Sequence, residues 1–271
     1  NSKEAITAAI NSGEKQIEID LRKGIDGKIY LSHDPIDNFK NPGLQLTDLV
    51  TALNIIAESK NQDVTIFFDI KESGIIEKLD EAILKTDQKN KLNGNYISIS
   101  FRHFVMGFKF EILLTARKLN PGRPLIFCYI PLNIIKVLGK FITALGQSKI
   151  TEICNIIDKF AGSHLAKDLA QTCVKINKEE LNETNNQGTN TLELYTTLPP
   201  DIILKTINYV CIPAILANKK LTNQLHKKGV NVAVWGVSET NIQKAIVDSG
   251  ADLVITDNPD IFPSTSSISE K

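Results

Sequence analysis

The 271-residue sequence lacks an excess of charge of either sign and has few cysteines. Lys plus Arg and Asp plus Glu each number 31, so the formal net charge is zero and there is no electrostatic basis for binding nucleic acid. Cys128, Cys154, Cys173 and Cys211 lie far apart, without the close pairs of a zinc site or the density of a disulfide scaffold. We interpret them as thiols of the core.

A long hydrophobic run is also missing. No apolar stretch reaches the roughly 18 to 20 residues that cross a bilayer. The nearest candidate, residues 130–145, is interrupted by Pro131, Asn133, Lys136 and Lys140, which predicts an amphipathic helix packed on a barrel. Peripheral contact of this helix with a membrane surface is the alternative. The sequence does not begin with Met, so we expect any targeting segment to lie outside it and leave the localisation open.

Short β-rich runs alternate with longer helical runs, as in 46–56 and 242–246, and this alternation predicts βα units around a parallel sheet. Seven strands are predicted, at Gln16–Leu21, Val64–Ile70, Tyr96–Ser100, Pro124–Cys128, Tyr209–Pro213, Asn231–Val237 and Asp252–Thr256. The pattern is typical of an α/β fold, a TIM (β/α)8-type barrel that is one strand short of eight. We therefore expect the first strand to precede Asn1 and to be absent from this chain.

The length suits one barrel domain, which we place at residues 1–262. Residues 175–190 are rich in Asn, Glu, Lys and Thr, and residues 146–173 have a helical pattern. Together they predict a helical and polar insertion around 146–195. Residues 263–271, with their many serines, are predicted to form a flexible tail.

The run Ile17-Glu18-Ile19-Asp20 contains two acids at strand spacing, which puts both carboxylates on one face and both isoleucines on the other. Carboxylates this close repel each other unless a divalent cation neutralises them. The pattern alone is weak, because an E-x-D run on an exposed strand is more often a solvated face.

A third acid, Asp69, ends the apolar run that begins at Val64, and Lys71 follows it. Active sites of α/β barrels are built from the C-terminal ends of strands. Three carboxylates, Glu18, Asp20 and Asp69, completed by waters, would suit one divalent cation, Mg²⁺ or Ca²⁺. A salt-bridged strand end is the structural alternative.

A histidine follows a turn signal and a short extended segment, in Leu31-Ser32-His33-Asp34-Pro35. Because imidazole titrates near neutrality, His33 could pass a proton to or from a phosphodiester polarised by a cation. A lone loop histidine is more often incidental. The other histidines, His103, His164 and His226, have no comparable setting, and we assign them no catalytic role.

Several motifs occur in order along nearly the whole chain. They are Asn1-Ser2-Lys3-Glu4-Ala5, Glu18-Ile19-Asp20, His33-Asp34-Pro35, Asp69-Ile70-Lys71, Ser100-Phe101 after the predicted 96–100 strand, Val234-Trp235-Gly236-Val237, Gly250-Ala251-Asp252 and Thr256-Asp257-Asn258-Pro259. As an ordered set they resemble the glycerophosphodiester phosphodiesterase family. The resemblance is weakest between Ile130 and Asn208.

This resemblance implies a TIM barrel, a divalent ion on three acids, and two histidines as general acid and base. Matched residue by residue, it implies the following roles: Glu18, Asp20 and Asp69 as metal ligands, His33 as one catalytic histidine, Lys71 as a contact to the phosphate oxyanion, and Trp235 as a wall of the substrate pocket.

The chain departs from the family pattern at three places. The family's opening His-Arg-Gly strand has no counterpart, so we expect a second histidine and a phosphate-binding arginine to precede Asn1. The insertion that usually follows the His-Asp motif is nearly absent between His33 and Gln45. The third acid is Asp69 rather than the commoner Glu, which is similar to the sphingomyelinase D branch of the superfamily.

The sequence therefore predicts a metal-dependent phosphoric diester hydrolase that converts glycerophosphodiesters to glycerol 3-phosphate and an alcohol. One alternative is phospholipase D or sphingomyelinase D-like cleavage of phospholipids or lysophospholipids. Another is a barrel that binds phosphate but is catalytically impaired. In each case the expected partner is a small phosphodiester or a lysophospholipid, and no protein partner is inferred.

Overall fold

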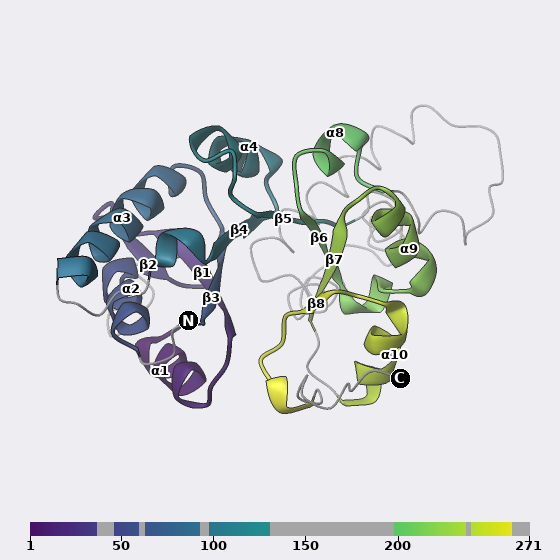
Figure 1. Ribbon diagram of the computed structural model, residues 1–271, viewed down its shortest axis with the longest axis horizontal. Helices are drawn as coiled ribbons and strands as arrows, with labels where there is room; N and C mark the ends of the chain where they lie inside the picture. The colour runs from purple at the N-terminus through teal and green to yellow at the C-terminus, as the bar shows by residue number, and fades with distance from the viewer. Residues whose placement is uncertain (37–45, 60–62, 93–97, 131–197, 237–239, 262–271) are drawn as a thin grey trace, which may run out of the picture. The chain divides into compact units, whose positions relative to one another are not determined.

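The computed structural model describes residues 1–36, 46–59, 63–92, 98–130, 198–236 and 240–261. The chain forms two compact units, Asn1–Cys128 and Tyr129–Lys271 (Figure 1). Three predicted features lie outside the described residues: nearly all of the 130–145 helix, the 146–195 insertion and the 263–271 tail. The assignment of residues 1–262 to one domain stays a prediction.

The first unit is a sheet with helices packed beside it. Its elements are α1 (Lys3–Asn11), β1 (Gln16–Lys23), β2 (Ile29–Leu31), α2 (Leu49–Glu58), β3 (Thr65–Ile70), α3 (Ile76–Leu92), the 3-10 turn η1 (Ile99–Phe101), β4 (His103–Gly107), α4 (Phe110–Leu119) and β5 (Leu125–Cys128). Within this unit the strand order is β2-β1-β3-β4-β5, and only β2 is antiparallel to its neighbour. Helices α1, α2 and α3 pack on one another in chain order (Figure 1).

Local chemistry explains where these elements begin. The Ser2 hydroxyl accepts a hydrogen bond from the amide of Ala5 at 3.1 Å and caps α1. The Asp48 carboxylate caps α2 by accepting from the amide of Thr51 at 3.0 Å. Gly13 follows α1 with φ of +86°, a conformation that residues with a side chain rarely adopt, so it lets the chain turn into β1.

The register of β1 against β3 positions the predicted acids. Asp20 pairs with Asp69 and Glu18 pairs with Phe67 across the parallel strands. Residues paired in register on parallel strands point to the same face of the sheet. The side chains of Glu18, Asp20 and Asp69 therefore point to one face. Ile19 points to the opposite face and is buried in the core.

The predicted strand at Tyr96–Ser100 is wrong in its described part. Residues 99–101 form the turn η1, and the strand β4 begins two residues later, at His103. The cause is Asp87 of α3, whose carboxylate accepts hydrogen bonds from the amides of Ile99 and Ser100 at 2.9 and 3.1 Å. Backbone groups bonded to a side chain are not available to a strand ladder. The Ser100-Phe101 pair therefore lies in the turn η1, directly before β4.

The second unit contains the remaining described elements. They are α8 (Asp201–Leu204), β6 (Tyr209–Pro213), η4 (Ala214–Leu216), α9 (Lys219–Lys227), β7 (Asn231–Trp235), α10 (Thr240–Ser249), β8 (Leu253–Val254) and η5 (Pro259–Ile261). Strands β6, β7 and β8 are parallel neighbours. Apart from small shifts at their ends, these strands and β1, β3 and β5 confirm six of the seven predicted strands.

The predicted core thiols are confirmed at Cys128 and Cys211, which are buried and form no disulfide. Cys154 and Cys173 lie outside the described residues. Among the helices that the structure describes, none has the length and apolar content to cross a membrane.

Candidate metal centre

Three carboxylates converge, two from one face of β1 and one from the C-terminal end of β3. Glu18, Asp20 and Asp69 each offer an oxygen atom, and these atoms all lie within 4.8 Å of one another. Asp20 and Asp69 are buried, and Glu18 is half-buried. The structure therefore brings the three predicted acids together.

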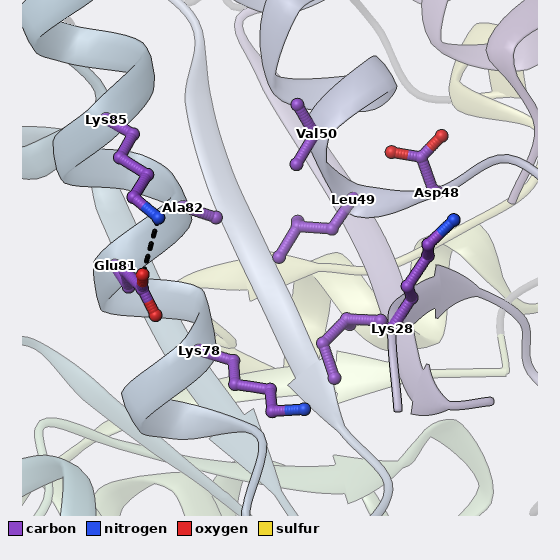
Figure 2. A pocket seen from close by; sticks show the side chains of 9 residues that line it. Lys28, Asp48, Leu49, Val50, Lys78, Glu81, Ala82 and Lys85 are labelled. Atoms are coloured by element: carbon purple, nitrogen blue, oxygen red, sulfur yellow. Dashed lines mark hydrogen bonds and ion pairs between the residues drawn. The ribbon is translucent and has the colours of Figure 1, made fainter. Parts of the chain in front are cut away.

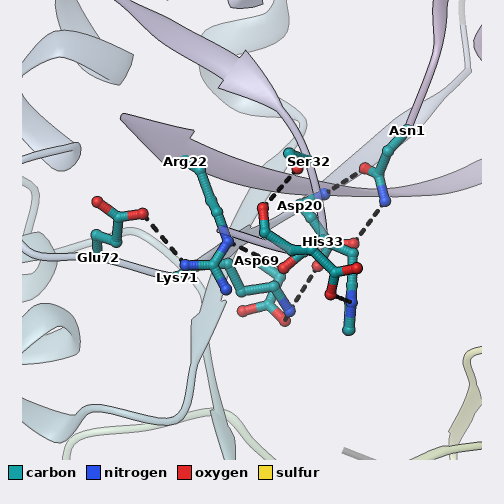
Figure 3. A network of polar contacts seen from close by, with 9 residues as sticks. Asn1, Asp20, Arg22, Ser32, His33, Asp69, Lys71 and Glu72 are labelled. Atoms are coloured by element: carbon teal, nitrogen blue, oxygen red, sulfur yellow. Dashed lines mark hydrogen bonds and ion pairs between the residues drawn. The ribbon is translucent and has the colours of Figure 1, made fainter. Parts of the chain in front are cut away.

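Lys71 binds two of the three acids. Its ammonium nitrogen lies 2.6 Å from Asp20 Oδ1 and 2.6 Å from Asp69 Oδ2, and its side chain is only 12% exposed. Figure 3 shows this side chain directed at the two carboxylates. Two of the three ammonium hydrogens are thereby directed at acids, which leaves one donor for another oxygen.

Burial and mutual repulsion control the charge of the acids. Burial, and then the charges of Asp20 and Asp69, raise the pKa of Glu18 well above its usual range. Burial also raises the pKa of Asp69, against the opposing charge of Lys71. Burial would raise the pKa of Asp20 as well, but the ammonium of Lys71 holds it below its ordinary value.

Lys71 stays charged in this cluster. Burial alone would lower the pKa of its ammonium, but Asp69 and Asp20 raise it above its ordinary value. Among the four side chains Glu18, Asp20, Asp69 and Lys71, one positive charge faces three carboxylates, which leaves these four with an excess of two negative charges when all three acids are ionised.

The residues present fit a divalent cation. Asp69 Oδ1 is buried and has no hydrogen-bond partner in the part of the chain that the structure describes. A buried carboxylate oxygen without a partner is costly, and a cation is one way to satisfy it. Carboxylate oxygens are the ligands that Mg²⁺ and Ca²⁺ prefer, and a 2+ charge equals the excess.

His33 lies in the loop after β2, as predicted, and its side chain is 46% exposed. Its Nδ1 lies 3.0 Å from Asp34 Oδ1. Figure 3 shows His33 beside Asp20. The loop therefore places one titratable imidazole next to the acid cluster.

Trp235 is the predicted wall of the substrate pocket. It ends β7 in the second unit, where it pairs in register with Pro213 and is half-buried. Its role as a pocket wall stays a prediction.

The remaining histidines have structural surroundings where they are described. The ring of His103 is buried in β4, with Nδ1 3.0 Å from the carbonyl oxygen of Ile99, and burial lowers its pKa. His226 Nε2 lies 2.8 Å from Asp252 Oδ2, and the same carboxylate oxygen accepts from the amide of Val232 at 2.7 Å. His164 lies outside the described residues.

The sequence interpretation missed two residues that support Asp20 and Asp69. Asn1 Nδ2 donates to Asp20 Oδ2 at 2.6 Å, and the Asp20 amide donates back to Asn1 Oδ1 at 2.8 Å. At the end of β4, a Cβ atom on Gly107 would lie 3.1 Å from the carbonyl oxygen of Ile70 and 3.9 Å from Asp69 Oδ1. Neither signal is visible in the sequence, since each depends on a strand or helix far along the chain.

A second group of charged residues surrounds a pocket of about 320 Å³ between β2, α2 and α3 (Figure 2). Lys85 lies 2.5 Å from Glu81 on α3, and both side chains are largely exposed. Lys78 donates to the backbone carbonyl of Gly27. Ile29 and Leu49 form part of the apolar lining.

Among the known proteins compared with this chain, matches are found only among solved structures. No family model matches the sequence, and no curated protein matches it significantly. Solved structures do match. One, provisionally named a glycerophosphoryl diester phosphodiesterase, is from Silicibacter pomeroyi, with a TM-score of 0.57, 12% identity, and coverage of 97% of this chain and 85% of that chain.

Two further solved structures are similar to this chain. A glycerophosphodiester phosphodiesterase from Parabacteroides distasonis matches with a TM-score of 0.55 and 13% identity, over 96% of this chain and 88% of its own. An Oleispira antarctica phosphodiesterase in complex with its product sn-glycerol-3-phosphate matches with a TM-score of 0.53 and 13% identity, over 94% and 85%.

The chain has the fold of a glycerophosphodiester phosphodiesterase. This confirms the predicted TIM-barrel-like α/β fold class and, at the level of fold, the resemblance drawn from the motifs. Within this fold, Asp69 lies near the C-terminal end of β3, the end at which α/β barrels place their active sites.

Proposed function

We propose that this protein is a phosphoric diester hydrolase that cleaves glycerophosphodiesters to glycerol 3-phosphate and an alcohol. The observation that carries the proposal is the convergence of Glu18, Asp20 and Asp69 within 4.8 Å, with Lys71 bound to two of them. The fold shared with glycerophosphodiester phosphodiesterases supports it.

Glu18, Asp20 and Asp69 would hold one divalent cation, Mg²⁺ or Ca²⁺. When bound, such a cation supplies Lewis-acid polarisation of a phosphoryl oxygen. Asn1 donates one hydrogen bond to the Asp20 carboxylate and accepts another from the Asp20 backbone amide, and the first of these would orient this ligand before any substrate binds.

Lys71 and His33 would act on the substrate directly. The remaining ammonium donor of Lys71 would contact a nonbridging phosphate oxygen, and its charge offsets the negative charge of the transition state. In the tautomer with a hydrogen on Nδ1, the 3.0 Å contact to Asp34 leaves Nε2 to accept the reacting proton, and the imidazolium formed in this way would donate that proton in a later step. The complementary histidine expected from the resemblance stays a prediction, as does the pocket wall at Trp235.

The test is release of glycerol 3-phosphate from glycerophosphocholine in Mg²⁺, Ca²⁺ or EDTA. We expect turnover that EDTA abolishes and that Asp20→Asn and His33→Ala each reduce by more than about 100-fold. Asp26→Asn, in the exposed β1–β2 hairpin, is the matched control and should keep full activity. Turnover that survives both site substitutions would refute the proposal.

The same assay distinguishes the alternatives. Turnover of micellar lysophosphatidylcholine without turnover of glycerophosphocholine would move the substrate to the phospholipase D or sphingomyelinase D class. Cation binding without turnover of either substrate would identify a barrel that binds but does not cleave.

A further inference from the structure

The position of His33 depends on its loop, since nearly half of the side chain is exposed to solvent. Two contacts connect this loop to β1. The amide of Ser32 donates to the carbonyl oxygen of Asp20 at 3.1 Å. The second contact reaches His33 itself, because Arg22 Nε donates to its carbonyl oxygen at 2.9 Å.

Arg22 follows Asp20 at strand spacing, on the same face of β1 as the two acids. Its side chain is 11% exposed, so it is largely withdrawn from water. A guanidinium in such a place needs acceptors from the protein. Figure 3 shows it between the His33 loop and Glu72.

Glu72 is the other acceptor. Arg22 Nη1 lies 3.2 Å from Glu72 Oε1, and Glu72 directly follows Lys71 in the loop after β3. The ion pair therefore joins the loop that carries His33 to the segment that carries Lys71 and Asp69. Because the guanidinium is planar and its donors have fixed directions, holding Nη1 also fixes the direction of Nε.

We propose that Arg22, held by Glu72, is a positioning residue that sets the place of His33 relative to the acid cluster. The effect on catalysis rests on the proposed function, whereas the effect on the loop does not. Charge-assisted hydrogen bonds are about twice as strong as neutral ones, so this one bond can restrain an exposed loop. Lys cannot reproduce the two-directional contact.

The kinetic test uses Arg22→Met and Arg22→Lys, with Lys23→Met as the control. Lys23 is the next residue on the same strand, has the same charge and is exposed. We expect Arg22→Met to lower kcat by about 10- to 100-fold, the cost of misplacing a reacting group by about 1 Å. KM should change by less than about twofold, because Arg22 does not bind substrate in this proposal. Arg22→Lys should recover part of kcat, and Lys23→Met should match the unmodified protein.

Glu72 offers an independent pair of variants. Glu72→Gln keeps an oxygen acceptor for Arg22 and should keep most of kcat, whereas Glu72→Ala should lose kcat as Arg22→Met does. A rise in KM with kcat unchanged in Arg22→Met would overturn the proposal and identify Arg22 as a substrate-binding residue instead. If kcat is unchanged in both Glu72→Gln and Glu72→Ala, Glu72 does not hold Arg22 in its working position and this part of the proposal is wrong.

Hydrogen exchange tests the loop without any substrate. In Arg22→Met and Glu72→Ala, the backbone amides of residues 31–36 should exchange severalfold faster, while those of α2 keep their rates. Unchanged exchange in residues 31–36 would overturn the proposal even if the protein is an active phosphodiesterase. If the unmodified protein cleaves no phosphodiester, the proposed function fails, and the exchange rates still decide whether Arg22 positions this loop.

Discussion

Two groups of charged side chains in the first unit combine lysines with acids in opposite surroundings. In the cluster at the ends of β1 and β3, Lys71 is 12% exposed and contacts two acids at 2.6 Å. In the pocket between α2 and α3, Lys85 is 70% exposed and contacts Glu81 at 2.5 Å. The contact distances are nearly equal, so distance does not distinguish the two groups of charged residues.

The two groups differ in burial. Water screens the exposed pair and solvates each partner, so a pair of this kind contributes little to stability. The buried acids have lost that solvation, and their pKa values shift in response to one another and to Lys71. The comparison teaches that burial, and not the contact distance, makes the charges of the first group depend strongly on one another.

Removing an acid from the buried cluster should have the largest effect. We expect Asp69→Asn to weaken Mg²⁺ or Ca²⁺ binding by more than about 100-fold, beyond the range for residues that only support a ligand. Isothermal titration calorimetry measures the affinity, with Asp26→Asn as control. Equal affinity in Asp69→Asn and the unmodified protein would show that the cation binds elsewhere.

Lys71→Met should cause the largest loss of stability in protein without a cation. Removing one partner of a buried ion pair costs about 3–5 kcal/mol, because the other charges stay buried without compensation. Added Mg²⁺ or Ca²⁺ should restore part of the loss, since a cation that binds only the folded state stabilises it. Urea unfolding with and without cation provides the measurement, and a cation-independent loss would contradict the interpretation.

Glu18→Gln should stabilise the cation-free protein at neutral pH. The folded pKa of Glu18 is raised above its unfolded value of about 4.3, so the favourable contribution present below that pH is lost as pH rises through the folded pKa. Gln does not ionise and avoids this loss. The melting temperature of the variant should exceed that of the unmodified protein by at least about 2 °C at pH 7.5.

The melting temperatures of the variant and the unmodified protein should converge as the pH falls below about 4, because the Glu18 carboxyl then becomes protonated in both the folded and the unfolded state. Thermal melts in EDTA across this range provide the measurement. A constant offset at all pH values would point to packing as the cause instead of ionisation.

A methyl group beside Asp69 should have a smaller effect. In Gly107→Ala the new Cβ would lie 3.1 Å from the Ile70 carbonyl, so a neighbour must move by a few tenths of an ångström. We expect a loss of about 1 kcal/mol in stability, at the lower end for overpacking, and weaker cation binding. Gly122→Ala is the matched control, since its Cβ would meet only Asn120 Oδ1, at 3.7 Å.

Lys85→Met in the exposed pocket should have the smallest effect. The Lys85–Glu81 pair is solvated on both sides, so its loss should produce no detectable shift in the melting temperature. A shift comparable with that of Lys71→Met would remove the distinction between the two charged groups.

Much of the candidate site could be predicted from the sequence because it follows from strand periodicity. Alternation alone puts Glu18 and Asp20 on one face, and the position of Asp69 at the end of an apolar run puts it at the same edge. The His33 loop was predicted from a turn signal in the residues just before it. Each of these patterns lies within a few adjacent residues, so it can be recognised without knowledge of the fold.

Other features depend on residues distant in the chain. The predicted 96–100 strand failed because Asp87, on the preceding helix, binds the backbone of Ile99 and Ser100. The role of Arg22 was missed because its partners, His33 and Glu72, lie 11 and 50 residues further along the chain. Contacts between residues so far apart in the chain produce no periodic pattern in the sequence.

The sequence by itself determined the alternation of strands and helices, the side of β1 that carries acids, and the chemical identity of the cluster. The tertiary structure alone decided that β1 and β3 pair with Asp20 opposite Asp69, that Lys71 binds both, and that Arg22 contacts both His33 and Glu72. The physical reason is that periodicity sets which face a side chain points to, whereas register and burial set which charges meet without water between them.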